Sequence, residues 1–185
     1  MLDKLTRIGT SGFYWLALLV IGLAFEAVAL FYQYGLDEMP CVMCIQVRLW
    51  VMALIILALL VLVLALRRLR FIPLAGHFLT VVIAAGLLER SYRLLGTERR
   101  FLYGDCGFDL GLPAWFTPDV WFPAMFQVET TCGYTPELVF GITMAEALIV
   151  SSAVFVLVSV AMTIAGLARL RQSDSPAAGR PSGQG

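Results

Sequence analysis

The chain has 185 residues, of which 60% are hydrophobic and only 14% are charged, and its formal net charge is zero. A composition this apolar is typical of an integral membrane protein and not of a soluble domain. The zero net charge gives no basic surface for nucleic acid, and the single histidine, His77, cannot build a metal cluster. Nucleic-acid binding and a histidine-rich metal centre are therefore excluded.

Four apolar runs, each about as long as a bilayer crossing requires, follow one another along the chain. The first is interpreted as an uncleaved transmembrane helix, because it is too long for a signal-peptide core and no small-residue cleavage site follows it. The predicted spans are residues 13–34, 45–66, 71–88 and 138–167. The sequence therefore predicts an all-α membrane protein with a bundle of four transmembrane helices.

The distribution of Lys and Arg predicts on which side of the membrane each connection lies. Four spans put both termini on one side. The basic residues of that side are Lys4, Arg7, Arg67, Arg68, Arg70, Arg169, Arg171 and Arg180. By the positive-inside rule this side is the cytoplasm. Arginines in loop 89–137 count for less because that loop is long and also acidic, so we expect loops 35–44 and 89–137 to face outward.

We expect one transmembrane domain over residues 1–171, and a disordered cytoplasmic tail over residues 172–185, which are rich in Ser, Pro, Gly and Ala. Within the long outer loop, residues 112–123 are dense in Trp, Phe and Pro. Aromatic residues prefer the level of the lipid headgroups, so this stretch predicts one or two short helices on the membrane surface. An irregular aromatic loop packed on the bundle is the alternative.

Cys41 and Cys44 form a Cys-x-x-Cys pair where a polar turn gives way to the second apolar run. If the helix begins near Pro40, its unpaired N–H groups and dipole favour a thiolate and lower a cysteine pKa below the free value of about 8.5. Arg48 then lies one turn after Cys44 on the same face, and its charge acts in the same direction. The alternative for Arg48 is a side chain that snorkels to the membrane surface near a helix end.

The other two cysteines, Cys106 and Cys132, lie in the long outer loop. Four cysteines allow three pairings, of which the Cys-x-x-Cys pair and the loop pair form the most natural partition. Two disulfides require an oxidising compartment, which agrees with the predicted topology. Static disulfides that hold the loops together are the alternative, and we disfavour it because a Cys-x-x-Cys ring constrains very little chain.

The stretch Pro40-Cys41-Val42-Met43-Cys44-Ile45, with Arg48 after it, resembles the signature of the DsbB family of bacterial inner-membrane disulfide-bond formation proteins. Leu112-Pro113-Ala114-Trp115, with Trp121 and Pro123 between the loop cysteines, resembles it as well. The resemblance covers nearly the whole chain. It implies a quinone reductase that reoxidises a DsbA-like thiol oxidase of the thioredoxin fold in the periplasm and passes the electrons to ubiquinone or menaquinone.

The resemblance also implies a role for each site residue. Cys106 and Cys132 would form the disulfide that meets the partner, with Cys106 taking the mixed disulfide. Cys41 and Cys44 would form the disulfide that reoxidises that pair. Cys44 would be the sulfur beside the quinone, and Arg48 the neighbour of the quinone ring.

Two features depart from the family's pattern. Family members often have a charged residue just before the arginine that corresponds to Arg48, and here that residue is Val47. No histidine occurs in residues 90–96. We therefore assign no quinone contact to the third span.

Two other kinds of protein share part of this pattern. A vitamin K epoxide reductase-like enzyme also links a Cys-x-x-Cys pair to a quinone, but in that family the pair follows the loop cysteines, and here it comes first. A structural membrane subunit or transporter is the other alternative. Four spans without a repeat and with few polar residues make a poor transport path.

Two acidic residues fall inside predicted spans, Glu26 in the first and Glu146 in the fourth. Each is expected about eight residues from the outer end of its helix, on the order of 12 Å deep. An intramembrane acid is a functional candidate, here for a proton route to a quinone. The plainer interpretation is a protonated carboxyl that hydrogen-bonds between helices. His77 is expected to be an interfacial residue.

Overall fold

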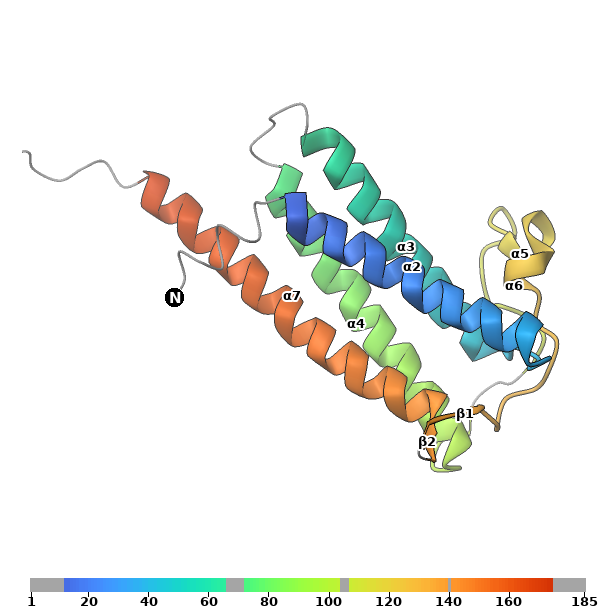
Figure 1. Ribbon diagram of the computed structural model, residues 1–185. Coiled ribbons are helices and arrows are strands. Elements are labelled where there is room, and N and C mark those ends of the chain that lie inside the picture. Colours follow the sequence, from blue (N-terminus) through green and yellow to red (C-terminus); the bar gives the residue numbers. More distant parts are fainter. Residues whose placement is uncertain (1–11, 66–71, 104–106, 140, 175–185) are drawn as a thin grey trace, which may run out of the picture.

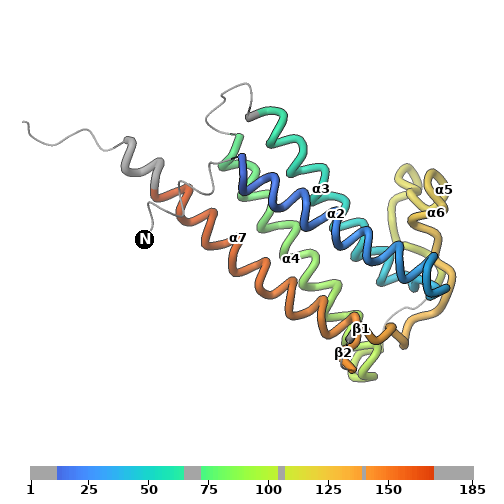
Figure 2. Tube along the Cα trace, in the orientation of Figure 1, coloured from blue at the N-terminus to red at the C-terminus, as the bar shows by residue number. Residues whose placement is uncertain are grey.

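The computed structural model describes residues 12–65, 72–103, 107–139 and 141–174, and it is mostly helical (Figures 1 and 2). The elements in chain order are α2 (Gly12–Gly35), α3 (Val42–Ala65), α4 (Ile72–Glu98), α5 (Pro118–Trp121), α6 (Pro123–Phe126), β1 (Glu137–Val139), β2 (Ile142–Thr143) and α7 (Met144–Asp174). Four of these helices, α2, α3, α4 and α7, are long and apolar enough to cross a membrane. The predicted fold class, an all-α membrane protein built on four spanning helices, is confirmed.

The four long helices pack in the order in which they occur in the chain. Helix α3 packs against both α2 and α4, and α4 packs against α7 along most of its length (Figure 1). The core of the bundle is apolar and includes Trp15, Leu54, Ala58 and Val61. Many large apolar side chains remain exposed on the outside of the helices. In a bilayer these side chains face lipid, so they need no protein partner to cover them.

One end of the bundle gathers the elements that matter for function. There α2 and α4 end, α3 and α7 begin, and the β1–β2 hairpin and the segment carrying α5 and α6 lie close by (Figure 1). We call it the cysteine end, because Cys41, Cys44 and Cys132 lie in it. A second, smaller core forms here around Ile45, Leu94 and Phe126. This core fixes the long loop against the start of α3.

Helices α4 and α7 differ from the spans expected at residues 71–88 and 138–167. Helix α4 continues past residue 88 to Glu98, where Glu89 forms an ion pair with Arg93 one turn later. Helix α7 begins at Met144, because the apolar residues before it pair as the short antiparallel strands β1 and β2. It ends at Asp174, past the expected start of the tail at residue 172.

The expected depth of Glu146 in the membrane is wrong. Glu146 lies in the first turn of α7, where its carboxylate accepts from the Thr143 N–H and the Thr143 hydroxyl accepts from the Glu146 N–H. This reciprocal pair is a capping box, which satisfies the free N–H groups of a helix start. Glu146 also forms an ion pair with Arg99.

Several predictions fall outside the described residues. They concern Cys106, the basic residues of segments 1–11 and 66–71, and the chain beyond residue 174. The two one-turn helices α5 and α6 lie within the aromatic stretch 112–123 and just after it. Their location on the membrane surface stays a prediction.

Candidate redox site

The Cys-x-x-Cys pair forms the N-terminus of α3. The Cys41 carbonyl accepts from the Ile45 N–H at 3.0 Å, which makes Cys41 the N-cap residue of a helix whose first residue is Val42. The Cys41 sulfur accepts from the Cys44 N–H at 3.3 Å. A side chain that accepts from the third N–H of a helix satisfies one of its unpaired donors, a place usually taken by Ser, Thr or Asp. The spacing of the motif therefore places both sulfurs at the helix start.

Three of the four cysteines predicted to form the site lie together at the start of α3. The Cys41 and Cys44 sulfurs lie 2.8 Å apart. Cys132, from the long loop, is hydrogen-bonded to Cys41. The segment before Cys132 is held by its backbone, since the N–H groups of Glu129 and Thr130 donate to the Pro40 carbonyl at 3.0 and 3.3 Å. A cysteine distant in sequence is thus held on the Cys-x-x-Cys pair by main-chain contacts.

The lowered cysteine pKa expected of a helix start is not found at Cys41. The hydrogen bond with Cys132 lowers the pKa of the Cys41 thiol, but the hydrogen bond with Cys44 and burial outweigh it and raise that pKa to about 12. Cys41 is only 1% exposed. Burial removes the water that would stabilise a thiolate. In this arrangement Cys41 remains a protonated thiol at neutral pH.

Arg48 lies one turn after Cys44, as predicted, and it is buried with 7% exposure. Its Nη1 donates to Gln33 Oε1 at 2.6 Å and to the Met125 carbonyl at 3.0 Å, and its Nη2 donates to the Ala29 carbonyl at 2.8 Å. The side chain therefore does not snorkel to the surface. It joins α3 to α2 and to the turn of α6.

Gln33 is a site residue that the sequence reasoning missed. It is buried on α2 and accepts the shortest of the Arg48 hydrogen bonds. A glutamine inside an apolar span is itself an unusual feature, and this signal was available in the sequence. Its partner was not, because Gln33 and Arg48 belong to different helices.

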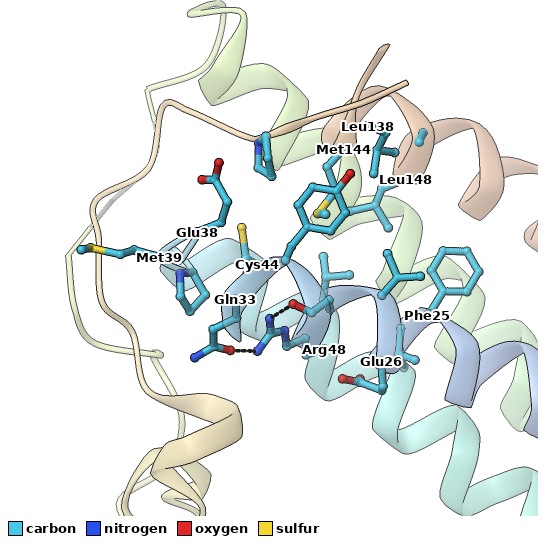
Figure 3. A pocket seen from close by; sticks show the side chains of 18 of the residues that line it. Phe25, Glu26, Gln33, Glu38, Met39, Cys44, Arg48, Leu138, Met144 and Leu148 are labelled. Atoms are coloured by element: carbon cyan, nitrogen blue, oxygen red, sulfur yellow. Dashed lines mark hydrogen bonds between the residues drawn. The ribbon is translucent and has the colours of Figure 1, made fainter. Parts of the chain in front are cut away.

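A pocket opens beside Cys44 at the cysteine end and encloses about 130 Å³ (Figure 3). Its polar side chains include Cys44 and Arg48 from α3 and Glu26 and Gln33 from α2. The apolar lining comes from α2, α3, β1 and α7 and includes Phe25, Val47, Leu138, Met144 and Leu148. An apolar pocket with a few convergent polar groups is the usual form of a ligand site. The departure at Val47 thus adds an apolar side chain to the lining of this pocket.

Two of the residues singled out in the sequence lie away from this pocket. Glu146 caps α7 and pairs with Arg99. His77 is 3% exposed and its ring packs against Tyr14 and Trp15, with ring centres 5.3 and 5.1 Å apart. It belongs to the packing at the opposite end of the bundle. Its expected position at the membrane interface stays a prediction.

Three cysteine sulfurs gathered at one end of a membrane bundle, with a cation beside them, are the groups that a membrane protein of thiol–disulfide exchange requires. The family model described as "Disulfide bond formation protein DsbB" matches residues 11–162. The chain therefore belongs to the DsbB family of membrane disulfide bond formation proteins. The family resemblance noted in the sequence is confirmed.

Relatives of the same description match almost end to end. The chain is 32% identical over 168 residues to "Disulfide bond formation protein B" of Shewanella loihica (strain ATCC BAA-1088 / PV-4), which covers 90% of this chain and 96% of that relative. It is 31% identical over 179 residues to the protein of the same name from Haemophilus influenzae (strain 86-028NP), covering 93% and 97%. The likeness thus extends over the whole bundle and the long loop.

Proposed function

We propose that the protein reoxidises a DsbA-like thiol oxidase of the thioredoxin fold and passes the electrons through two cysteine pairs to a membrane quinone, ubiquinone or menaquinone. The observation that carries the proposal is the contact of Cys132 with Cys41, beside a pocket lined by Cys44 and Arg48. Electrons would run from the partner's dithiol to Cys106–Cys132, then to Cys41–Cys44, and from Cys44 to the quinone.

The sulfur cluster supports exchange between the two pairs. Thiol–disulfide exchange needs an attacking sulfur in contact with a disulfide sulfur. Cys132 and Cys41 are in hydrogen-bond contact, and Cys41 is in contact with Cys44, so exchange along this row needs little movement. Two independent structural disulfides would have no reason to share one cluster. Cys106 would extend the row to the partner protein.

The pocket fits the headgroup of a quinone. A quinone, when bound, accepts two electrons and two protons. A cavity of about 150 Å³ in another protein holds one benzene ring, so about 130 Å³ is on the scale of a single ring. Glu26 lies in this pocket with both carboxyl oxygens lacking a hydrogen-bond partner among the described residues, so the pocket has an unused polar group for a ligand.

An apolar groove continues from the pocket and would suit an isoprenoid tail. Phe25, Val51 and Leu148 line both the pocket and a second cavity of about 460 Å³ among the four long helices. The lining of this second cavity is almost entirely apolar apart from the hydroxyls of a few serines and Tyr14. The ring would thus lie beside Cys44 while the tail remains in the hydrocarbon layer.

Arg48 would assist the chemistry through its charge. Its guanidinium lies one turn from Cys44, so it stabilises negative charge on that sulfur and on a ring oxygen nearby. The hydrogen bonds from Arg48 to Gln33 and to two carbonyls hold the guanidinium in place before a ligand arrives. A donor fixed in advance costs no reorganisation during the reaction. Gln33 is in this sense a positioning residue for Arg48.

We further propose that the protein lies in the bacterial cytoplasmic membrane as a single transmembrane domain over residues 1–171. Both termini would be cytoplasmic and the cysteine end would face the periplasm. The basic residues of the termini and of the connection around residues 67–70 support this orientation through the positive-inside rule. The periplasm is also the compartment in which the DsbA-like partner and stable disulfides occur.

The proposal is tested by following quinone absorbance after the purified protein is mixed with a reduced DsbA-like oxidase in detergent. Wild type should reduce the quinone, and Cys44→Ser and Cys106→Ser should each abolish the reduction, because each removes one pair from the path. Circular dichroism of both variants serves as the folding control. A wild type that leaves the quinone untouched while its cysteines stay oxidised would show that the disulfides are static.

A further inference from the structure

Glu26 is a buried acid for which the packing of the bundle provides no partner. It lies in the middle of α2 with 5% exposure, and neither carboxyl oxygen has a hydrogen-bond partner among the described residues. Nearly all buried polar groups in proteins are hydrogen-bonded, so an exception calls for an explanation. An ionisable side chain inside a membrane span is costly, and it usually marks a functional site.

Glu26 forms no hydrogen bond between helices within the part of the chain that the structure describes. The Arg48 guanidinium acts on Glu26 electrostatically, but it donates its hydrogen bonds to Gln33 and to the carbonyls of Ala29 and Met125. Glu26 is thus close to a fixed positive charge and still has both oxygens available. Figure 3 shows Glu26 and Gln33 as side chains of one helix on either side of Arg48.

Among the described residues that line the pocket, Glu38 is the other carboxyl, and it comes from the connection between α2 and α3. Cys44 and Arg48 face the pocket from α3, and Glu38, Tyr32 and Tyr134 lie at the end toward the loops. The pocket residues that α7 contributes are Met144, Ala147 and Leu148, all apolar. Glu26 is therefore the carboxyl at the inner end of the pocket, on the opposite side of Arg48 from the loop.

We propose that Glu26 is the proton donor of this pocket: its protonated carboxyl hydrogen-bonds to a ring oxygen of the bound quinone and transfers a proton to it during reduction. This inference rests on the proposed function and adds a catalytic residue to it. Arg48 and Cys44 supply the charge and the electrons from α3, and Glu26 supplies a proton from α2. The two helices thus place complementary groups in one pocket.

The step balances in electrons and protons. Oxidation of the Cys41 and Cys44 thiols forms one S–S bond and releases two electrons and two protons. Conversion of the quinone to the hydroquinone consumes two electrons and two protons. Glu26 gives one of these protons and becomes a carboxylate, and it regains one from the two that the thiols release. The other thiol proton goes to the second ring oxygen, so no further oxidant or reductant is needed.

The test compares Glu26→Gln with Glu26→Asp and with Glu146→Gln as a matched control. Glutamine keeps the size and a hydrogen-bond donor but carries no transferable proton, whereas aspartate keeps the acid. Glu146 is an acid outside the pocket, and glutamine can still serve in its capping box. Quinone affinity is measured by titration, the reduction rate by stopped-flow absorbance across pH, and the carboxyl by infrared difference spectroscopy with and without quinone.

Glu26→Gln should keep the quinone affinity of wild type and slow the reduction by about 10²-fold or more, the usual contribution of a general acid. In wild type the rate should fall as the pH rises, because Glu26 loses its proton, and this fall should be absent in Glu26→Gln. The infrared band of the carboxyl that shifts when quinone binds should be absent as well. Glu26→Asp should recover part of the rate, and Glu146→Gln should behave as wild type. An unchanged rate in Glu26→Gln, or a loss of affinity that accounts for the slower rate, would overturn the assignment. Failure of wild type to reduce quinone would instead refute the proposed function.

Discussion

The buried hydrogen bond between Gln33 and Arg48 allows a quantitative prediction. In Gln33→Leu the Arg48 guanidinium loses an acceptor at 2.6 Å, between two side chains that are 6% and 7% exposed. A hydrogen bond to a charged group contributes about 1.5–3 kcal/mol. The free energy of unfolding should therefore fall by about 1.5–3 kcal/mol, which is roughly a 10- to 150-fold change in the unfolding equilibrium.

The same substitution should weaken quinone binding by about tenfold or more, the lower end of that range, because Gln33 holds Arg48 in the pocket. Unfolding is followed by tryptophan fluorescence in mixed micelles of increasing sodium dodecyl sulfate content. Quinone affinity is measured by titration with a short-tailed ubiquinone. Both measurements use the full chain in detergent.

Gln46→Leu is the matched control. Gln46 also accepts a hydrogen bond from an arginine, Arg90, at 3.0 Å, and it donates to the Leu110 carbonyl, but it does not line the quinone pocket. It should lose stability of the same order and keep the quinone affinity of wild type. If both glutamine variants lose stability and neither loses affinity, Gln33 serves packing only and the positioning of Arg48 is refuted.

Three further predictions concern the cysteines and the packing. In the reduced protein, the rate at which iodoacetamide alkylates Cys41 should rise tenfold per pH unit through pH 10, because the pKa of Cys41 is raised to about 12. Cys44→Ser should lower that pKa. A rate that reaches a plateau near pH 8.5 would contradict this. Gly86→Ala should reduce the free energy of unfolding by about 1–3 kcal/mol, measured in the same micelles, because a Cβ there lies 2.6 Å from two ring atoms of Trp50. Thr143→Ala should reduce it by about 0.5–2 kcal/mol through loss of the cap of α7, whereas Thr143→Ser should not.

The local part of the site could be predicted from the sequence. Hydropathy shows four spans, and the helical period alone puts Arg48 one turn after Cys44. The contact of Cys132 with Cys41 could not be predicted in this way, because it depends on main-chain bonds between the long loop and Pro40. Against the lowering effect of Cys132, the pKa of Cys41 is raised by its hydrogen bond with Cys44 and by burial, and the burial is not visible in the order of the residues.

The start of the last helix shows a second limit. The apolar residues before Met144 continue into the apolar run of α7, and hydropathy does not distinguish a short strand from a helix. The structure pairs them as β1 and β2, with Gly141 in the left-handed region at φ 75°. Glu146 is therefore at the helix start and not deep in the span. For Glu26 the same reasoning gave the right place within the helix, because α2 has no such interruption.

The proposed function requires that electrons from a partner's dithiol reach a quinone through this protein. The most direct measurement is a single turnover without oxygen, in which a reduced DsbA-like oxidase is mixed with the protein and a known amount of quinone. The disulfides formed in the partner are counted by mass spectrometry, and the quinone consumed is read from absorbance. One quinone should be reduced for each partner disulfide formed. Partner oxidation without quinone reduction, or no partner oxidation at all, would contradict the proposed function.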